Sequence, residues 1–193
     1  MNTEQFVGLF SGLASVNRFS QYRLINPESV LEHSGMVALT TLILLDKLEI
    51  DDMNTRLDAL SYALCHDVDE ILTGDIPMPT KYATDDTVKM FDSLSWLNAN
   101  KVDVAFGVQL APYNSVPKEI KCIVKLADVL AVFYKCYQEI ELFGNKSLIS
   151  ATKNLDRALS RRFDDLKRDR QVSDELDCFI RDSISAVISW RQK

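Results

Sequence analysis

The chain has 193 residues, of which 47% are hydrophobic and 26% are charged, so it is long enough to bury a core and unlike a disordered chain. Its net charge of −6 argues against duplex nucleic acid as the main partner, because such binders present a basic surface. With 6 glycines and 5 prolines, the composition favours helices over a turn-rich β fold.

Apolar residues recur at helical spacing along the whole chain, and no segment alternates convincingly. The pattern predicts an all-α fold of about six or seven helices in a single domain, residues 1–193. The expected helices are 3–16, 29–48, 54–74, 85–100, 117–143, 147–170 and 173–190. Ser29-x-x-Glu32 is typical of a capping box that opens the second helix, and Gly74 is expected to end the third. Residues 17–28 and 74–79 are expected to be loops.

The sequence predicts a cytoplasmic protein. Its longest apolar run, residues 36–45, is too short to span a membrane, and the polar N-terminus lacks a secretion signal. The cysteines form no C-x-x-C pair, so we interpret them as buried free thiols, with a zinc site or a disulfide as unsupported alternatives. They are Cys65, Cys122, Cys136 and Cys178.

The two histidines both lie near acids. His33 follows Glu32, and His66 precedes Asp67 and stands one helical turn before Glu70. A lone histidine on a helix is more often a hydrogen-bonded core or surface residue than a metal ligand. Two such groups on neighbouring helices favour a metal site, but spacing alone leaves ordinary hydrogen-bonded histidines as the alternative.

His66 and the adjacent Asp67 could bind one metal together, with His33 as a third ligand and Asp128 as a fourth. Asp128 stands in the apolar run 123–132, where a carboxylate is out of place unless it is paired or coordinating. An ion pair with Lys125 or Lys135, or a solvent-facing position, is the alternative. A set of two imidazoles and two carboxylates suits a catalytic Zn²⁺, Co²⁺ or Mn²⁺ ion, with Mg²⁺ as a further option, rather than a structural zinc.

Five sequence blocks, read together, resemble one known family. They are Asn17-Arg18-Phe19, Glu32-His33-Ser34, His66-Asp67-x-x-Glu70, Leu72-Thr73-Gly74-Asp75-Ile76-Pro77 and Pro79-x-Lys81-Tyr82. With Asp128, they resemble the H…HD…D pattern of HD-domain phosphohydrolases, and in particular the bacterial 5′-deoxynucleotidases and the phage dATP triphosphohydrolases. The resemblance covers about residues 5–143, and the C-terminal helices, 147–190, carry no matching motif.

This resemblance implies an HD-domain helical bundle that hydrolyses the 5′ phosphoester of a deoxynucleotide. It implies that His33, His66, Asp67 and Asp128 bind the metal. Glu70 would orient or deprotonate the attacking water, and Asp75 would lie near the sugar or that water; the alternatives are a surface glutamate and a turn residue. Arg18 and Lys81 would bind phosphate, and Phe19 and Pro79 would wall the sugar or base.

The resemblance leaves the substrate open. The bacterial enzymes have Trp directly after the arginine, where this chain has Phe19. The sequence Asn26-Pro27-Glu28-Ser29-Val30 looks closer to the phage proteins, so we favour dATP, with dADP and dAMP, and a role in phage nucleotide-pool control in the host cytoplasm. Broad hydrolysis of deoxynucleoside monophosphates is the first alternative.

Other functions are weaker alternatives. The arginine and proline-rich blocks argue against hydrolysis of cyclic nucleotides or guanosine tetraphosphate, which other HD proteins perform. A non-catalytic helical binding or scaffold protein would carry these residues by chance. Members of the family that this chain resembles form dimers or larger rings, so the resemblance implies a homo-oligomer.

Overall fold

The computed structural model describes residues 2–107 and 116–192, apart from the side chains of Met78 and Pro79. The predicted all-α fold is confirmed: within the described residues the only β pairing is an isolated bridge between Asn17 and Ser29. The helices are α1 (Thr3–Ser15), α2 (Val30–Lys47), α3 (Met53–Cys65), α4 (Glu70–Thr73), α5 (Met78–Lys81), α6 (Asp85–Phe106), α7 (Lys118–Tyr137), η1 (Gln138–Leu142), η2 (Lys146–Asn154), α8 (Leu155–Asp169) and α9 (Asp174–Trp190).

The start of α2 follows the predicted capping box. The Ser29 side chain accepts a hydrogen bond from the Glu32 N–H, and the Glu32 carboxylate accepts one from the Ser29 N–H. These two bonds satisfy donors that a helix start leaves free. They fix the first turn of α2, and that turn carries His33.

The third predicted helix differs from the structure. Instead of running unbroken from residue 54 to Gly74, α3 ends at Cys65, a turn covers 66–69, and α4 begins at Glu70. No glycine or proline marks this break, and the turn residues His66 and Asp67 make contacts with Ala63 and Arg18. The buried side chains of α3 are Ala59, Tyr62 and Ala63, whereas Leu57 and Leu64 are exposed.

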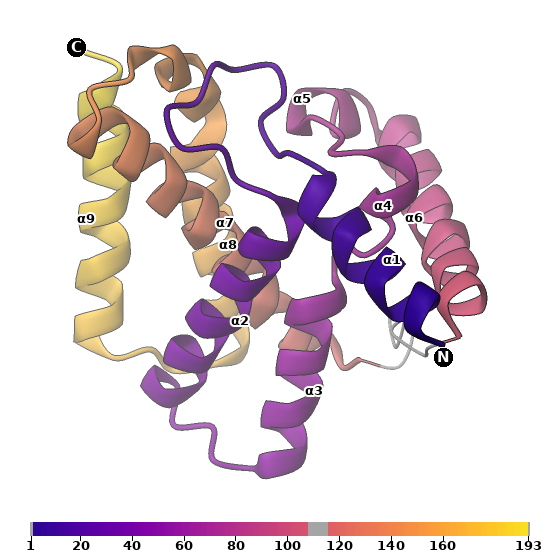
Figure 1. Cartoon of the computed structure of the whole chain (residues 1–193). Coiled ribbons are helices and arrows are strands. Elements are labelled where there is room, and N and C mark those ends of the chain that lie inside the picture. The colour runs from indigo at the N-terminus through magenta and orange to yellow at the C-terminus, as the bar shows by residue number, and fades with distance from the viewer. Residues whose placement is uncertain (1, 108–115, 193) are drawn as a thin grey trace.

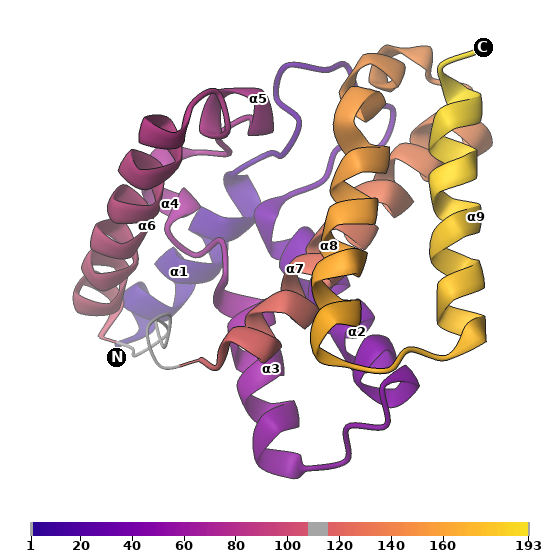
Figure 2. The ribbon, with the colours of Figure 1, turned by 180° about the vertical axis from the view of Figure 1, so that it is seen from behind.

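The helix α7 lies at the centre of the molecule. It packs against α2 and α3 on one side and against α8 on the other, and α9 in turn covers α8 (Figures 1 and 2). A continuous cluster of buried apolar side chains joins these helices, from Val37 to Trp190. A second cluster lies where α1 and α6 meet Val30 and Val68. The loop 17–28 crosses the top of the bundle in Figure 1.

The prediction of a single domain stays a prediction, although the first cluster joins the motif-bearing helices to the C-terminal ones. The four cysteines are free, as predicted, but only Cys136 is buried, and Cys178 is exposed. Among the described residues, none of the helices is both long and apolar enough to cross a membrane.

Candidate metal centre

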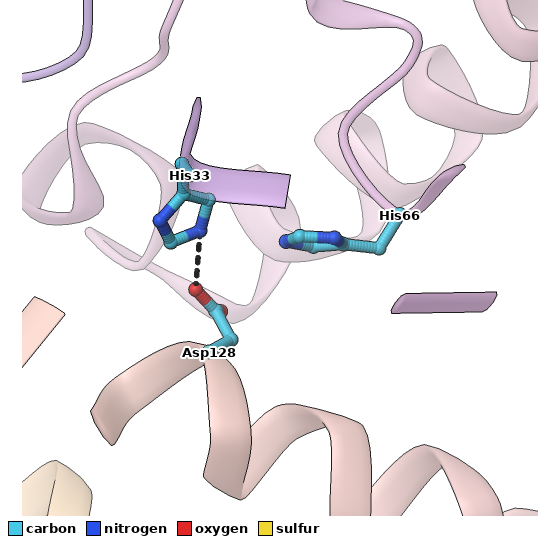
Figure 3. A group of neighbouring side chains, drawn as sticks. All are labelled: His33, His66 and Asp128. Carbon is cyan, nitrogen blue, oxygen red and sulfur yellow. Dashed lines mark hydrogen bonds and ion pairs between the residues drawn. The ribbon is translucent and has the colours of Figure 1, made fainter. Parts of the chain in front are cut away.

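Three predicted ligands converge between α2, α3 and α7. One ligand atom each from His33, His66 and Asp128 lies within 4.8 Å of the others. The Nε2 atom of His33 lies 3.0 Å from Oδ1 of Asp128, and the two imidazole ring centres are 5.5 Å apart. Figure 3 shows the His66 ring and the Asp128 carboxylate directed toward His33. The group could hold one divalent ion.

Asp67, the fourth predicted ligand, lies beside this group. Its Oδ2 is 3.1 Å from Nε2 of His66 and 3.9 Å from Nε2 of His33. The same oxygen accepts a hydrogen bond of 2.9 Å from Nη1 of Arg18. Asp67 therefore contacts both histidines and also connects the group to the loop 17–28.

Each ligand takes its place from the end or the face of a helix. His33 belongs to the first turn of α2 and is fully buried, His66 is the residue that caps the end of α3, and Asp128 is on the α7 face beside them. Nδ1 of His66 lies 2.8 Å from the carbonyl oxygen of Ala63. Because a carbonyl can only accept, Nδ1 carries the proton, and Nε2 is left free to bind a metal.

The side chains of this group carry opposite charges that shift one another's pKa values. Burial alone would lower the pKa of His66, but the charge of Asp67 outweighs it and raises that pKa to about 9. Burial would raise the pKa of Asp67, yet His66 and Arg18 hold it well below its usual range. For Asp128, the bond and charge of His33 overcome burial and lower the pKa to about 2.

Glu70 is buried next to these acids. One of its oxygens, Oε2, has no hydrogen-bond partner. Burial, and then the negative charge of Asp67, raise the pKa of Glu70 to about 9. Glu70 and Asp67 also line a cavity of about 10 Å³, enough for about one water molecule. A protonatable carboxyl group thus faces a water-sized space beside the candidate metal ligands.

Lys81 brings a positive charge to the same cavity. It lines the cavity together with Asp67, Glu70 and Phe91. Burial would lower its pKa, but Asp67 and other nearby acids raise it, so the lysine is charged. The side chain of Pro79, which we predicted to wall the pocket, lies outside the described part of the chain.

Phe19 has an unusual backbone conformation. Its φ is +55°, a left-handed value that large side chains rarely adopt. Its N–H donates a hydrogen bond of 2.9 Å to Oδ2 of Asp75, and the Arg18 guanidinium lies 5.9 Å from its ring centre. Asp75 therefore holds the residue next to Arg18 in place, which the sequence did not indicate.

Sequence reasoning missed two buried acids that hold the loop 17–28. Oε2 of Glu28 lies 3.6 Å from Nε of Arg18 and 3.8 Å from Nδ1 of His33. Glu139, in η1, accepts hydrogen bonds from the N–H groups of Ile25 and Asn26. A signal was available only for Glu139, an acid within the predicted apolar helix 117–143.

Comparison with known proteins gives one consistent family. The family model described as 5′-deoxynucleotidase YfbR-like matches residues 5–182 of this chain. The 5′-deoxynucleotidase YfbR of Salmonella typhi is 30% identical over 172 residues, which cover 84% of this chain and 85% of that protein. A 5′-deoxynucleotidase of Vibrio parahaemolyticus is 30% identical, with 84% and 88% of the two chains covered.

Solved structures have the same fold. An HD-domain phosphohydrolase from Listeria innocua superposes with a TM-score of 0.65 at 25% identity, covering 83% of this chain and 80% of its own. The PH0347 protein of Pyrococcus horikoshii gives 0.65 at 28% identity, covering 95% and 99%. A cyanophage S-2L HD phosphohydrolase, DatZ, bound to dA and one catalytic Zn²⁺, gives 0.58 at 15% identity, covering 100% and 95%, a likeness of fold alone.

Proposed function

This chain belongs to the YfbR-like 5′-deoxynucleotidase family and is a hydrolase of deoxynucleotides, and we propose that its catalytic centre is the group around His33, His66, Asp67 and Asp128. The observation that carries the proposal is the convergence of three ligand atoms within 4.8 Å beside a buried carboxyl group, Glu70. Such an arrangement would combine a metal site with a proton-transfer group.

The donors fit a divalent ion. Nε2 of His66 is buried and faces the other ligands, and Oδ2 of Asp67, itself a proposed ligand, lies 3.1 Å from it. Two imidazoles with carboxylates suit Zn²⁺, Co²⁺ or Mn²⁺, and Mg²⁺ less well. When bound, such an ion polarises a phosphate oxygen and lowers the pKa of a coordinated water. We expect His66→Ala to remove metal binding, measured as metal content after dialysis.

Glu70 is our candidate for the proton-transfer group. Its unpartnered oxygen and the water-sized cavity that it lines support this assignment, because a water in that cavity would be next to the carboxyl group. Asp75 is the second candidate, but its Oδ2 already accepts the Phe19 N–H, which favours a positioning role.

Arg18 and Lys81 are our candidates for phosphate binding. Asp67 uses Nη1 of Arg18 and Glu28 lies beside Nε, so Nη2 remains for phosphate oxygens. Lys81 reaches the same region from α5 through the shared cavity. Both cations lie near Asp67, so a phosphate bound by them would be beside the proposed metal ligands.

For the substrate we propose deoxyadenosine phosphates, with dATP preferred over dADP and dAMP. The Phe19 ring and residues 76–79, which lead into α5, would form a flat wall for the base and leave little room for a 2′-hydroxyl. The structural similarity to DatZ, described as bound to dA, is consistent with this choice. Hydrolysis of all deoxynucleoside monophosphates is the alternative, which the names of the bacterial relatives favour.

A panel of substrates distinguishes a preference for deoxyadenosine phosphates from broad hydrolysis of deoxynucleoside monophosphates. Deoxynucleoside mono-, di- and triphosphates and their ribose counterparts are assayed with Zn²⁺, Co²⁺, Mn²⁺ and Mg²⁺, and released nucleoside and phosphate are measured. We expect the highest rates with deoxyadenosine phosphates and at least about tenfold lower rates with ribonucleotides. Equal rates for the four bases, or activity on monophosphates alone, would support the broad 5′-deoxynucleotidase.

We also propose that the chain forms a homo-oligomer and acts in the cytoplasm on the nucleotide pool, in a phage-infected host if the chain is phage-encoded. Exposed apolar side chains on α2, Leu39 and Ile43, are consistent with a subunit contact. The unpaired cysteines suit a reducing compartment. Light scattering that gives only monomers would refute the oligomer.

A further inference from the structure

Three buried polar atoms without hydrogen-bond partners face one another at the edge of the candidate metal centre. They are Nε of Arg18, Oε2 of Glu28 and Nδ1 of His33. The carboxylate oxygen lies 3.6 Å from the arginine nitrogen and 3.8 Å from the histidine nitrogen, and the three side chains are 12%, 10% and 0% exposed. Buried polar groups are nearly always partnered, so three together need an explanation.

The backbone brings Glu28 to this position. The two ends of the loop 17–28 pair with each other: Arg18 N–H donates to the Glu28 carbonyl at 2.8 Å, and Val30 N–H donates to the Val16 carbonyl at 2.9 Å. The Asn17–Ser29 bridge lies between these bonds. Since α2 starts at Val30, His33 follows within one turn, and Glu28 stands between the arginine and the histidine.

The two histidines differ in how their Nδ1 atoms are held. Nδ1 of His66 donates to the carbonyl oxygen of Ala63, which leaves Nε2 free for a metal. His33 directs Nε2 to Asp128 at 3.0 Å, and its Nδ1 has no partner except the nearby Glu28. A ligating histidine normally donates its other N–H to a carboxylate or a carbonyl. Glu28 is in the place where His33 needs that acceptor.

We propose that Glu28 is a positioning residue whose Oε2 accepts hydrogen bonds from both His33 Nδ1 and Arg18 Nε, and so links the metal ligand to the phosphate-binding arginine. A shortening of each contact by less than about 1 Å brings it to hydrogen-bond distance. The proposal rests on the proposed function, since it assigns Glu28 to the same metal and substrate. With Asp67 on Nη1 and Glu28 on Nε, the guanidinium is held by two carboxylates.

The link makes a specific prediction about metal affinity. In Glu28→Gln the side chain keeps its size but loses its charge and one of its two acceptor oxygens, so it cannot serve both donors with the same strength. We expect this variant to bind Zn²⁺ about 10–100-fold more weakly than the wild type, the usual effect of losing such a partner. We also expect a higher KM for the deoxynucleotide, because Arg18 is less firmly held.

Glu32→Gln is the matched control. It removes the same charge one residue from His33, and glutamine also serves as the third residue of a capping box, so α2 keeps its start. Zinc affinity is measured by competition with a chelator for both variants and the wild type. An imidazole N–H signal of His33 is followed by NMR, and it should be present in the wild type and shifted or lost in Glu28→Gln alone.

The possible results distinguish a failure of the proposed function from a failure of the role proposed for Glu28. If the wild type binds no divalent ion, the proposed function itself is wrong. If the wild type binds zinc and Glu28→Gln binds it within twofold, the role of Glu28 is refuted, as it is when the control is weakened equally. If Glu28→Gln does not fold, Glu28→Asp is used: it keeps the charge, and we expect intermediate affinity, whereas affinity within twofold of the wild type refutes the link.

Discussion

Two buried glutamates, Glu139 and Glu70, show opposite ways of placing an acid inside this protein. The Glu139 carboxylate accepts hydrogen bonds from the N–H groups of Ile25 and Asn26 and from Nδ2 of Asn145, at 2.9, 2.8 and 2.6 Å. Nζ of Lys135 lies 3.4 Å away. Glu70 is also buried, yet its Oε2 has no partner.

The pKa values of the two acids shift in opposite directions. Burial would raise the pKa of Glu139, but the bonds from Asn145, Ile25 and Asn26 lower it. Burial and nearby acids raise the pKa of Glu70 to about 9. A satisfied acid holds structure, here the loop that carries Arg18, whereas an unsatisfied acid beside a cavity is typical of a functional site.

The largest expected effect is on catalysis. Glu70→Gln keeps the shape of the side chain but can neither donate nor accept a proton as an acid or base, so we expect turnover to fall by about 10²–10⁴. Metal content should stay at the wild-type level, because Glu70 is not among the proposed ligands. Steady-state kinetics and metal analysis check both. Turnover within a factor of two of the wild type would exclude Glu70 and make Asp75 the next variant to test.

The second expected effect is on stability. Glu139→Ala leaves Lys135 buried without its charge partner, so we expect the free energy of unfolding to fall by about 3–5 kcal/mol. The control is Glu175→Ala, which breaks an exposed ion pair with Lys47 and should cost less than about 1 kcal/mol. Urea unfolding measures both variants. Equal losses would mean that Glu139 is not an anchor of the loop.

The comparison of the two glutamates also explains how much of the fold and of the candidate site the sequence could predict. Helices, the capping box at Ser29 and the convergence of His33, His66 and Asp128 follow from local spacing and a motif. The break after Cys65 does not, because no breaker residue marks it. The roles of Glu28 and Glu139 depend on the path of the loop 17–28, whose partners are distant in sequence.

A third effect concerns pH. In the metal-free protein Glu70 and His66 both have folded pKa values of about 9, above the ordinary values of 4.5 and 6.5. Both groups bind protons more tightly when folded, so their contribution to stability is full below the ordinary values and is lost as the pH rises toward 9. We expect the Tm in chelator to fall between pH 6 and 9.

Added metal should counteract this fall of Tm at high pH. A ligating imidazole must be neutral, so the rise in Tm on adding Zn²⁺ should grow over the same pH range. Thermal unfolding with and without metal, in steps from pH 6 to 9, measures the difference. A metal-induced rise in Tm that is constant or shrinks with pH would contradict a histidine site of this kind.

The smallest expected effect concerns base preference, and it depends on the anchored loop. Asp75 accepts a hydrogen bond from the Phe19 N–H, so we expect the backbone to stay in place when the ring is removed. Phe19→Ala should therefore leave metal affinity unchanged and alter the relative kcat/KM for the four bases by about tenfold or less, since an apolar wall discriminates weakly. Phe19→Trp is the matched variant: it keeps a flat ring and should stay closer to the wild-type ranking.

Because alanine is also strained at the left-handed φ of Phe19, equal losses for all four bases would indicate that the residue supports the loop rather than the base. An unchanged ranking in both variants would remove Phe19 from the substrate pocket, and the wall would then have to come from residues 76–79.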